Sequence, residues 1–165
     1  MEESMLRLYM VKERDILYRF LHEILPTKKR LKEIYSIPSS KCDNCEHEES
    51  NIHFVFQCEK LTDVVIWFKS LLQNFCNLDN PRLINLCFLL TPRLDKKHKN
   101  AAIMLMSTFI VSMWQIRQNN MNSDTYKNYI KNKLYQKKVL INYILGNKTE
   151  NLLPENICYM RRSDL

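Results

Sequence analysis

Three cysteines and one histidine lie along a short segment at a spacing that suits a metal ion. Two residues separate Cys42 from Cys45, seven separate Cys45 from His53, and four separate His53 from Cys58. Zinc in structural sites takes four nitrogen or sulfur ligands at the corners of a tetrahedron. One tight turn can supply the first two ligands, and a second short element must supply the others. The spacing therefore predicts one structural zinc ion, bound in a knuckle that spans residues 42–58.

Two alternatives to this ligand set come from the same segment. The cysteines could be ordinary buried side chains, since free cysteine is among the most buried residue types. His47 could replace His53 as the imidazole ligand, but its place inside the loop makes it a poorer partner for Cys58. With four protein ligands the site would be closed, and closed sites are structural and not catalytic.

A helical turn must position the second pair of ligands. Ser50 is a plausible N-cap for a turn over residues 52–57, with His53 near its start and Cys58 at its end. Residues five apart on an ideal α-helix point about 140° away from each other. The turn must therefore tighten or end near Gln57 if both side chains are to reach one ion.

The composition indicates an all-α protein. The chain has 165 residues, of which 45% are hydrophobic, so it can bury the core of one domain. Its single glycine, Gly146, excludes phosphate-binding loops, dinucleotide fingerprints and sheets rich in tight hairpins. We expect an irregular bundle of about six helices over residues 1–147, with an inserted Cys3His zinc knuckle, and a C-terminal tail over residues 148–165.

Apolar residues at helical spacing and helix-breaking residues locate the expected helices. Thr27 should cap a short basic helix, Ser123 or Asp124 should cap the last long helix, and Gly146 should end it. The segment that begins at Ala101 is apolar on nearly all sides, which predicts a helix at the centre of the bundle. The other expected helices cover residues 4–24, 28–35, 61–75, 81–90 and 123–145.

The remaining cysteines and the terminal segment favour an intracellular protein, in the nucleus or the cytoplasm. Cys76 and Cys87 lie in apolar runs and, with Cys158, do not resemble a disulfide framework. The N-terminus is acidic where a secretion signal would be basic. The longest apolar stretch, residues 101–114, is too short to span a bilayer. No membrane association is expected.

A formal net charge of +7 permits a polyanionic partner. Basic residues gather before and within the knuckle and along one stripe of the last helix, where they fall within about 40° of one another. Tyr35 could stack on an unpaired base. The alternative is that these residues form ordinary solvated helix faces. The candidate phosphate contacts are Lys28, Lys29, Arg30, Lys32, Lys41, Lys127, Lys131 and Lys138.

The order of these motifs resembles the zinc-binding region of reverse transcriptases from non-LTR retrotransposons. In that family a helix ends in Leu-Pro-Thr, a basic residue and leucine follow, and then come a Cys-x-x-Cys pair, Glu-Thr, histidine, cysteine and a helix bearing tryptophan. The similar positions here are Leu25-Pro26-Thr27, Arg30-Leu31, Cys42, Cys45, Glu49-Ser50, His53, Cys58 and Trp67.

A later segment adds to the likeness. Trp114, Arg117 and Asn119 are similar to the Trp-x-x-Arg-Asn that often closes the helical region of the family, although Gln118 separates the last two residues here. The likeness covers roughly residues 18–119. Packing of Trp67 and Trp114 in the core is the alternative explanation for both tryptophans.

The resemblance implies a module that lies downstream of a polymerase and grips RNA or DNA, alone or with the rest of a reverse transcriptase. No pair of neighbouring aspartates suggests a two-metal polymerase site, so we expect no enzyme activity. The alternative function is a domesticated protein-protein interaction module in which the zinc is purely structural. A zinc enzyme is the third possibility, and the closed ligand set argues against it.

Overall fold

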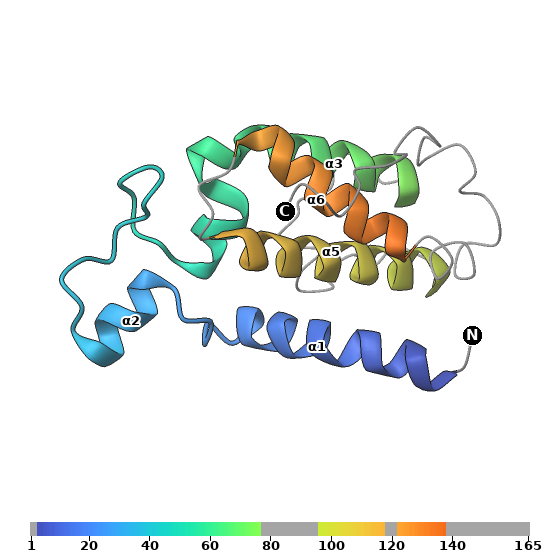
Figure 1. Cartoon of the computed structure of the whole chain (residues 1–165), viewed down its shortest axis with the longest axis horizontal. Coiled ribbons are helices and arrows are strands. Elements are labelled where there is room, and N and C mark those ends of the chain that lie inside the picture. The colour runs from blue at the N-terminus through green and yellow to red at the C-terminus, as the bar shows by residue number, and fades with distance from the viewer. Residues whose placement is uncertain (1–2, 77–95, 118–121, 138–165) are drawn as a thin grey trace, which may run out of the picture.

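The structure is a computed structural model that describes residues 3–76, 96–117 and 122–137. Within these ranges it is all-α, as the composition predicts, and its only strand-like feature there is an isolated bridge between Lys41 and Glu48. The elements in chain order are α1 (Glu3–Leu21), α2 (Lys28–Tyr35), a π-helical turn η1 (His53–Gln57), a 3-10 turn η2 (Glu59–Leu61), α3 (Thr62–Cys76), α5 (Lys96–Ile116) and α6 (Ser123–Gln136) (Figure 1).

Several expectations fall outside the described residues. These are the helix over residues 81–90, the end of the last helix at Gly146, the environment of Cys87 and Cys158, and the tail over residues 148–165. The proposed boundary at residue 147 is therefore still a prediction.

Helix α5 is the centre of the bundle. It contacts α1, α3, α6 and η1, and Figure 1 shows it between α1 on one side and the pair α3 and α6 on the other. Its apolar residues are buried on all sides, as the sequence predicts. Two of its buried hydroxyl groups are satisfied within the helix, because Ser107 donates to the carbonyl of Ile103 at 2.6 Å and Thr108 donates to that of Met104 at 2.8 Å. The buried hydroxyl group of Ser112 has no hydrogen-bond partner among the described residues.

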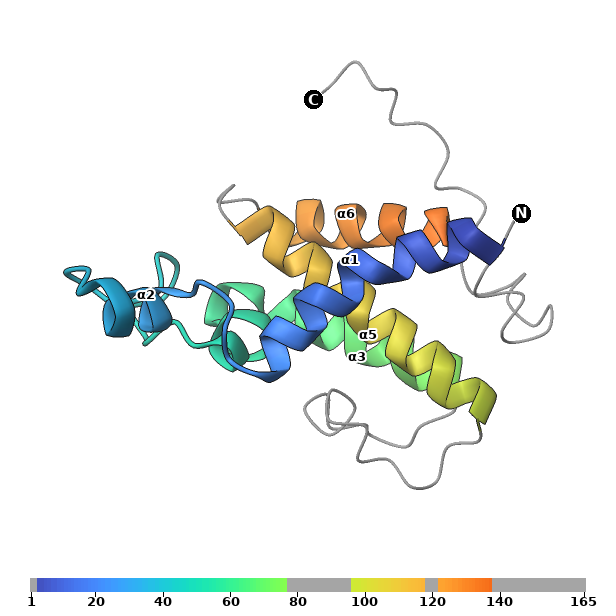
Figure 2. The same cartoon turned by 90° about the horizontal axis from the view of Figure 1, so that it is seen from below.

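Apolar side chains from the neighbouring helices close the core around α5. Phe68 of α3 stacks on Phe109 with ring centroids 4.0 Å apart and an interplanar angle of 10°. Helix α6 buries Tyr126, Ile130 and Leu134. Helix α1 lies obliquely across the other side of α5 (Figure 2). The bundle is thus held mainly by burial of apolar surface.

Two helix boundaries differ from the sequence-based expectation. Helix α1 ends at Leu21, because Glu23 adopts a left-handed conformation with φ of 55° and Ile24 turns back to donate to the carbonyl of Arg19 at 2.9 Å. The N-cap of α6 is Asn122, not Ser123 or Asp124, and its side chain accepts a hydrogen bond from the amide of Thr125 at 2.9 Å.

Both tryptophans are partly buried against the core. Trp67 also reaches α6, where the ammonium group of Lys131 lies 5.7 Å from the centre of its ring. The ring of Trp114 meets that of Phe54 in η1 edge-on, with centroids 5.9 Å apart. Trp114 therefore connects the end of α5 to the knuckle.

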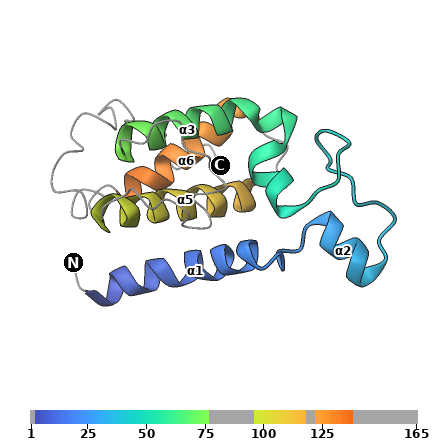
Figure 3. The same ribbon diagram turned by 180° about the vertical axis from the view of Figure 1, so that it is seen from behind.

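Helix α2 stands apart from the bundle, beside the knuckle (Figure 3). Its predicted bounds and its predicted cap are confirmed, since Thr27 accepts a hydrogen bond from the amide of Arg30 at 3.4 Å. It buries no residue, and Ile34 and Tyr35 are 51% and 71% exposed. Packing in the core therefore cannot be what holds α2 in place.

None of the helices in the described ranges combines the length and the apolar character that a membrane-spanning segment requires.

Candidate metal centre

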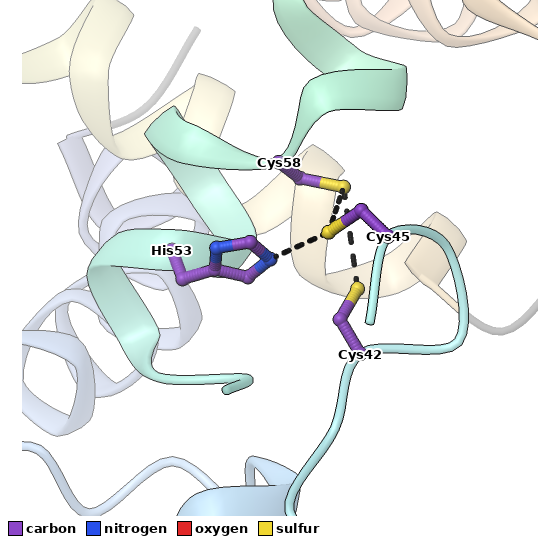
Figure 4. A group of neighbouring side chains, drawn as sticks. All are labelled: Cys42, Cys45, His53 and Cys58. Atoms are coloured by element: carbon purple, nitrogen blue, oxygen red, sulfur yellow. Dashed lines mark hydrogen bonds between the residues drawn. The ribbon is translucent and has the colours of Figure 1, made fainter. Parts of the chain in front are cut away.

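The fold brings the four predicted ligands together from two short elements. Cys42 and Cys45 come from the loop after α2, His53 begins η1, and Cys58 directly follows η1. Their side chains point toward one another in Figure 4. The four ligand atoms all lie within 4.8 Å of one another, and all of the residues are buried except Cys45, which is partly buried. This group could hold one metal ion.

The distances between ligand atoms match a tetrahedral centre. A zinc–sulfur bond of about 2.3 Å places two sulfur atoms of a tetrahedron about 3.8 Å apart. The sulfur of Cys58 lies 4.0 Å from that of Cys42 and 3.8 Å from that of Cys45. The Nε2 atom of His53 lies 3.1 Å from the sulfur of Cys45, so the imidazole occupies the fourth corner.

The turn between His53 and Cys58 brings both side chains to one point, as a shared ion requires, but not in the way that the sequence predicts. The helix does end at Gln57, where the chain becomes extended at Cys58, but the preceding turn widens to a π-helix and does not tighten. A π-turn is closed by hydrogen bonds between residues five apart, so it brings such residues closer to one face than an α-turn does. Ser50 caps the start of the turn by accepting from the amide of His53 at 3.1 Å.

Backbone hydrogen bonds shape the loop that carries the first two ligands. The amide of Cys42 donates to the carbonyl of His47 at 2.7 Å, and the amide of Glu49 donates to the carbonyl of Ser40 at 2.8 Å. The amide of Asn44 donates to the sulfur of Cys42 at 3.4 Å. A hydrogen bond of this kind stabilises a thiolate, which is the form that binds a metal.

The electrostatics of the cluster favour a shared cation. Burial, with the charge of Cys42 adding to it, raises the pKa of the Cys58 thiol to about 12. Three sulfur atoms this close cannot all be ionised unless a cation neutralises them. Burial also lowers the pKa of His53, which keeps its imidazole in the neutral form that can bind a metal.

His47 does not belong to the cluster. Its side chain is exposed, and its Nδ1 atom lies 3.0 Å from the carbonyl oxygen of Cys45. The ring centroid is 5.9 Å from that of His53. Of the two candidate imidazoles, the geometry favours His53.

A buried ion pair beside the centre was not assigned a role from the sequence. Glu49, on the loop between Cys45 and His53, is 2% exposed and accepts from the guanidinium group of Arg117 at the end of α5. The same carboxylate oxygen accepts from the amide of Lys28 at 2.9 Å. Both residues belong to the family likeness, but no pattern in the sequence indicates that they meet.

Arg117 holds several parts of the molecule at once. It also donates to the carbonyl of Pro26 at 3.2 Å, and its guanidinium carbon lies 4.9 Å from the ring centre of Trp114 and 5.6 Å from that of Phe54. Three parts of the chain therefore meet at the side chain of Arg117. They are the loop between α2 and η1, called the metal loop from here on, the turn before α2, and the end of α5.

Most of the basic residues predicted to contact phosphates near the knuckle pair with acidic side chains. Lys28 pairs with Asp43, while Lys29 and Glu48 lie 3.1 Å apart, Lys41 and Glu46 2.9 Å, and Arg30 and Glu33 3.5 Å. Among the described residues, Lys32 is the one member of this group with no such ion pair, and it is exposed. These basic side chains surround the knuckle, but their charge is largely compensated.

The second predicted group lies on α6, away from α2 (Figure 1). Lys127 and Asp124 lie 3.8 Å apart, and Lys131 covers the ring of Trp67. Lys138 lies outside the described residues. The structure therefore does not join the two groups into one basic surface.

Comparison with protein-family models, with curated proteins and with solved structures gives no match. The function of the chain must therefore be argued from the geometry of the metal centre and its surroundings.

Proposed function

We propose that this chain is a non-catalytic helical module stabilised by one structural zinc ion, and that it contacts RNA or DNA through α2. The observation that carries the first part is the cluster of one imidazole and three sulfur atoms within 4.8 Å. Soft thiolate ligands with one imidazole favour zinc over magnesium, calcium or manganese. Four protein ligands leave no open position for a substrate or a reactive water, which supports a structural role.

Metal content tests the zinc proposal directly. Protein purified without added zinc should contain one zinc per chain, and cobalt substitution should give the intense absorption bands of a tetrahedral thiolate site. His53→Ala should reduce the metal content, whereas His47→Ala, the matched control from the same knuckle, should leave it unchanged. Well-folded protein without bound metal would refute the proposal.

The nucleic-acid part of the proposal depends on the exposed side of α2. Lys32 is exposed and not ion-paired among the described residues, and Tyr35 is 71% exposed three residues further along the helix. A free lysine and an exposed ring suit a phosphate and an unpaired base of a single strand. The paired residues Lys28, Lys29, Arg30 and Lys41 would have to exchange an acidic partner for a phosphate.

Salt dependence of binding tests this contact. Affinity for single-stranded RNA or DNA should fall steeply with salt concentration, and Lys32→Gln should reduce the slope of the log–log plot by about 1. Lys60→Gln removes the same charge from an exposed residue of η2 and should change the slope much less. Binding that is insensitive to salt, or no binding at all, would refute the nucleic-acid part of the proposal.

An origin in a retrotransposon reverse transcriptase is part of this proposal. What supports it is the convergence of residues that carry the likeness and lie far apart in the sequence. Arg117 is in direct contact with Pro26 and with Glu49, and its guanidinium group also lies over the ring of Trp114. A likeness that arose by chance would not require these positions to meet.

A protein-interaction module is the second candidate, and exposed apolar side chains favour it. Val11 and Tyr18 of α1 are 58% and 57% exposed and lie seven residues apart, which places them on the same side of the helix. Sedimentation analysis over a range of concentrations separates this candidate from the first. Association that is lost in Tyr18→Ser and unaffected by salt would favour it.

A further inference from the structure

Among the described residues, the hydrogen bonds and ion pairs that connect α2 to another part of the chain are all with the metal loop. The amide of Lys28 donates to the Glu49 carboxylate at 2.9 Å, and the amide of Lys29 donates to the Glu49 carbonyl at 3.2 Å. The side chains of the same two lysines pair with Asp43 and Glu48 of that loop. Since α2 buries no residue, these polar contacts are what position it.

Glu49 is held by the ligand loop on one side and by Arg117 on the other. It lies between Cys45 and His53, and its amide is bonded to Ser40, two residues before Cys42. A metal ion bound by these ligands closes the loop around Glu49. Arg117 holds the carboxylate from the other side and directly follows α5, the central helix of the bundle.

We propose that occupancy of the metal centre controls whether α2 is held in place, with Glu49 as the positioning residue and Arg117 as its anchor on the bundle. This inference rests on the proposed zinc function. It adds that zinc acts beyond the knuckle, on the position of the helix that carries Lys32 and Tyr35.

The physical reason is that α2 is too short to be stable by itself. It has 8 residues, and isolated helices shorter than about 12–15 residues are marginal in water. Without the ion, the loop that carries Cys42 and Cys45 is held by a few backbone hydrogen bonds. Glu49 then loses its fixed position, and the first turn of α2 loses the acceptor of two amides.

Coupling of this kind is reciprocal. If metal binding favours the docked position of α2, then docking of α2 must increase metal affinity by the same factor. A change at Glu49 should therefore weaken zinc binding although Glu49 is not a ligand. If zinc stabilised the knuckle alone, a change at Glu49 would not weaken zinc binding.

Residue-resolved amide exchange of the full chain tests the proposal. The amides of Lys28 and Lys29 should be protected in zinc-loaded protein, and removal of zinc with a chelator should reduce this protection by about tenfold or more relative to the amides of α5. Glu49→Gln with zinc bound should cause a loss of the same kind and weaken zinc affinity by a similar factor. The matched control is Glu46→Gln, which removes an exposed carboxylate of the same loop that pairs with Lys41 and not with α2, and it should change neither quantity.

Each outcome decides the proposal. Equal protection of α2 in zinc-loaded and zinc-free protein would overturn it, as would full protection in zinc-loaded Glu49→Gln. If the zinc-free protein unfolds completely, the comparison of α2 protection in zinc-loaded Glu49→Gln with that in zinc-loaded Glu46→Gln decides between the outcomes. Zinc content is measured on the same samples. A chain that binds no zinc refutes the proposed function together with this inference, whereas zinc binding with unchanged α2 protection refutes the inference alone.

Discussion

The helical bundle and the metal lobe, defined as α2 with the knuckle over residues 42–58, are held by different interactions. The bundle surrounds α5 with apolar side chains, and the rings of Phe68 and Phe109 are stacked at its centre. In the metal lobe, α2 and the ligand loop have few buried residues and are connected by ion pairs, backbone hydrogen bonds and the ligand cluster.

The two regions meet at η1 and at Arg117. Phe54 and Val55 of η1 are buried in the core, whereas His53 and Cys58 at its ends face the metal centre. Arg117 extends from α5 to Glu49. The comparison teaches that burial of apolar surface holds the bundle, whereas polar contacts around a candidate metal site hold the metal lobe, so the two should respond to different perturbations.

Removal of the metal should show the difference between the bundle and the metal lobe most clearly. Structural zinc contributes on the order of 10 kcal/mol of apparent free energy in zinc-finger peptides near pH 7. We therefore expect Cys58→Ser to lose zinc and to show the largest fall in melting temperature of any variant described here. Circular dichroism with metal analysis measures both. Equal melting temperatures of the variant and the wild type would contradict the ligand role of Cys58.

A cavity in the core should weaken the bundle without releasing the metal. Phe68→Ala removes a fully buried ring, and such a change costs about 3–5 kcal/mol. Chemical denaturation measures the loss, and zinc stoichiometry should stay at one. Ile66→Ala, at a 59% exposed position of the same helix, should change the free energy of unfolding much less.

Arg117→Met should damage the contact between the regions. It leaves the buried carboxylate of Glu49 without its charged partner, and breaking a buried pair in this way costs about 3–5 kcal/mol. Replacing both residues, as in Arg117→Met with Glu49→Leu, should recover part of this loss, because no unpaired charge remains buried. Thermal unfolding of the two single variants and of the double variant measures the coupling free energy between Arg117 and Glu49. Purely additive losses would show that the pair is not coupled.

Acid should release the metal while the bundle keeps its helices. Burial raises the pKa of Cys58 to about 12 in the free centre, so zinc must displace at least this proton in order to bind. Affinity should therefore fall by about tenfold or more for each pH unit of acidification. Competition with a chelator at several pH values measures the slope, with helix content followed in parallel. An affinity independent of pH would contradict thiolate ligation.

The smallest effect is expected at the cap of α2. Thr27→Ala removes the acceptor of the Arg30 amide, and loss of such a cap costs about 1 kcal/mol. Because α2 adds nothing to the core, the loss should appear as faster amide exchange in α2 with almost no change in the melting temperature. A large fall in the melting temperature would mean that α2 is not the separate element described here.

The sequence by itself determined the helical class, the central position of α5 and the identity of the four candidate ligands. Helical class and burial follow from apolar periodicity and from the near absence of glycine. The ligands follow from short spacings, because residues close in sequence can be brought to one point by a single loop and turn. These are local properties of the chain.

Tertiary structure decided which residues around the ligands are buried and paired and what form the ligand turn takes, which the ligand spacing could not. Glu46, Glu48 and Glu49 are equivalent as sequence, yet only Glu49 is buried, because only it meets Arg117 from 68 residues away. The π-turn likewise depends on Phe54 and Val55 packing in the core while His53 and Cys58 turn toward one candidate metal site. Long-range contacts choose among locally equivalent residues, since burial and charge pairing depend on which elements come together and not on their neighbours in sequence.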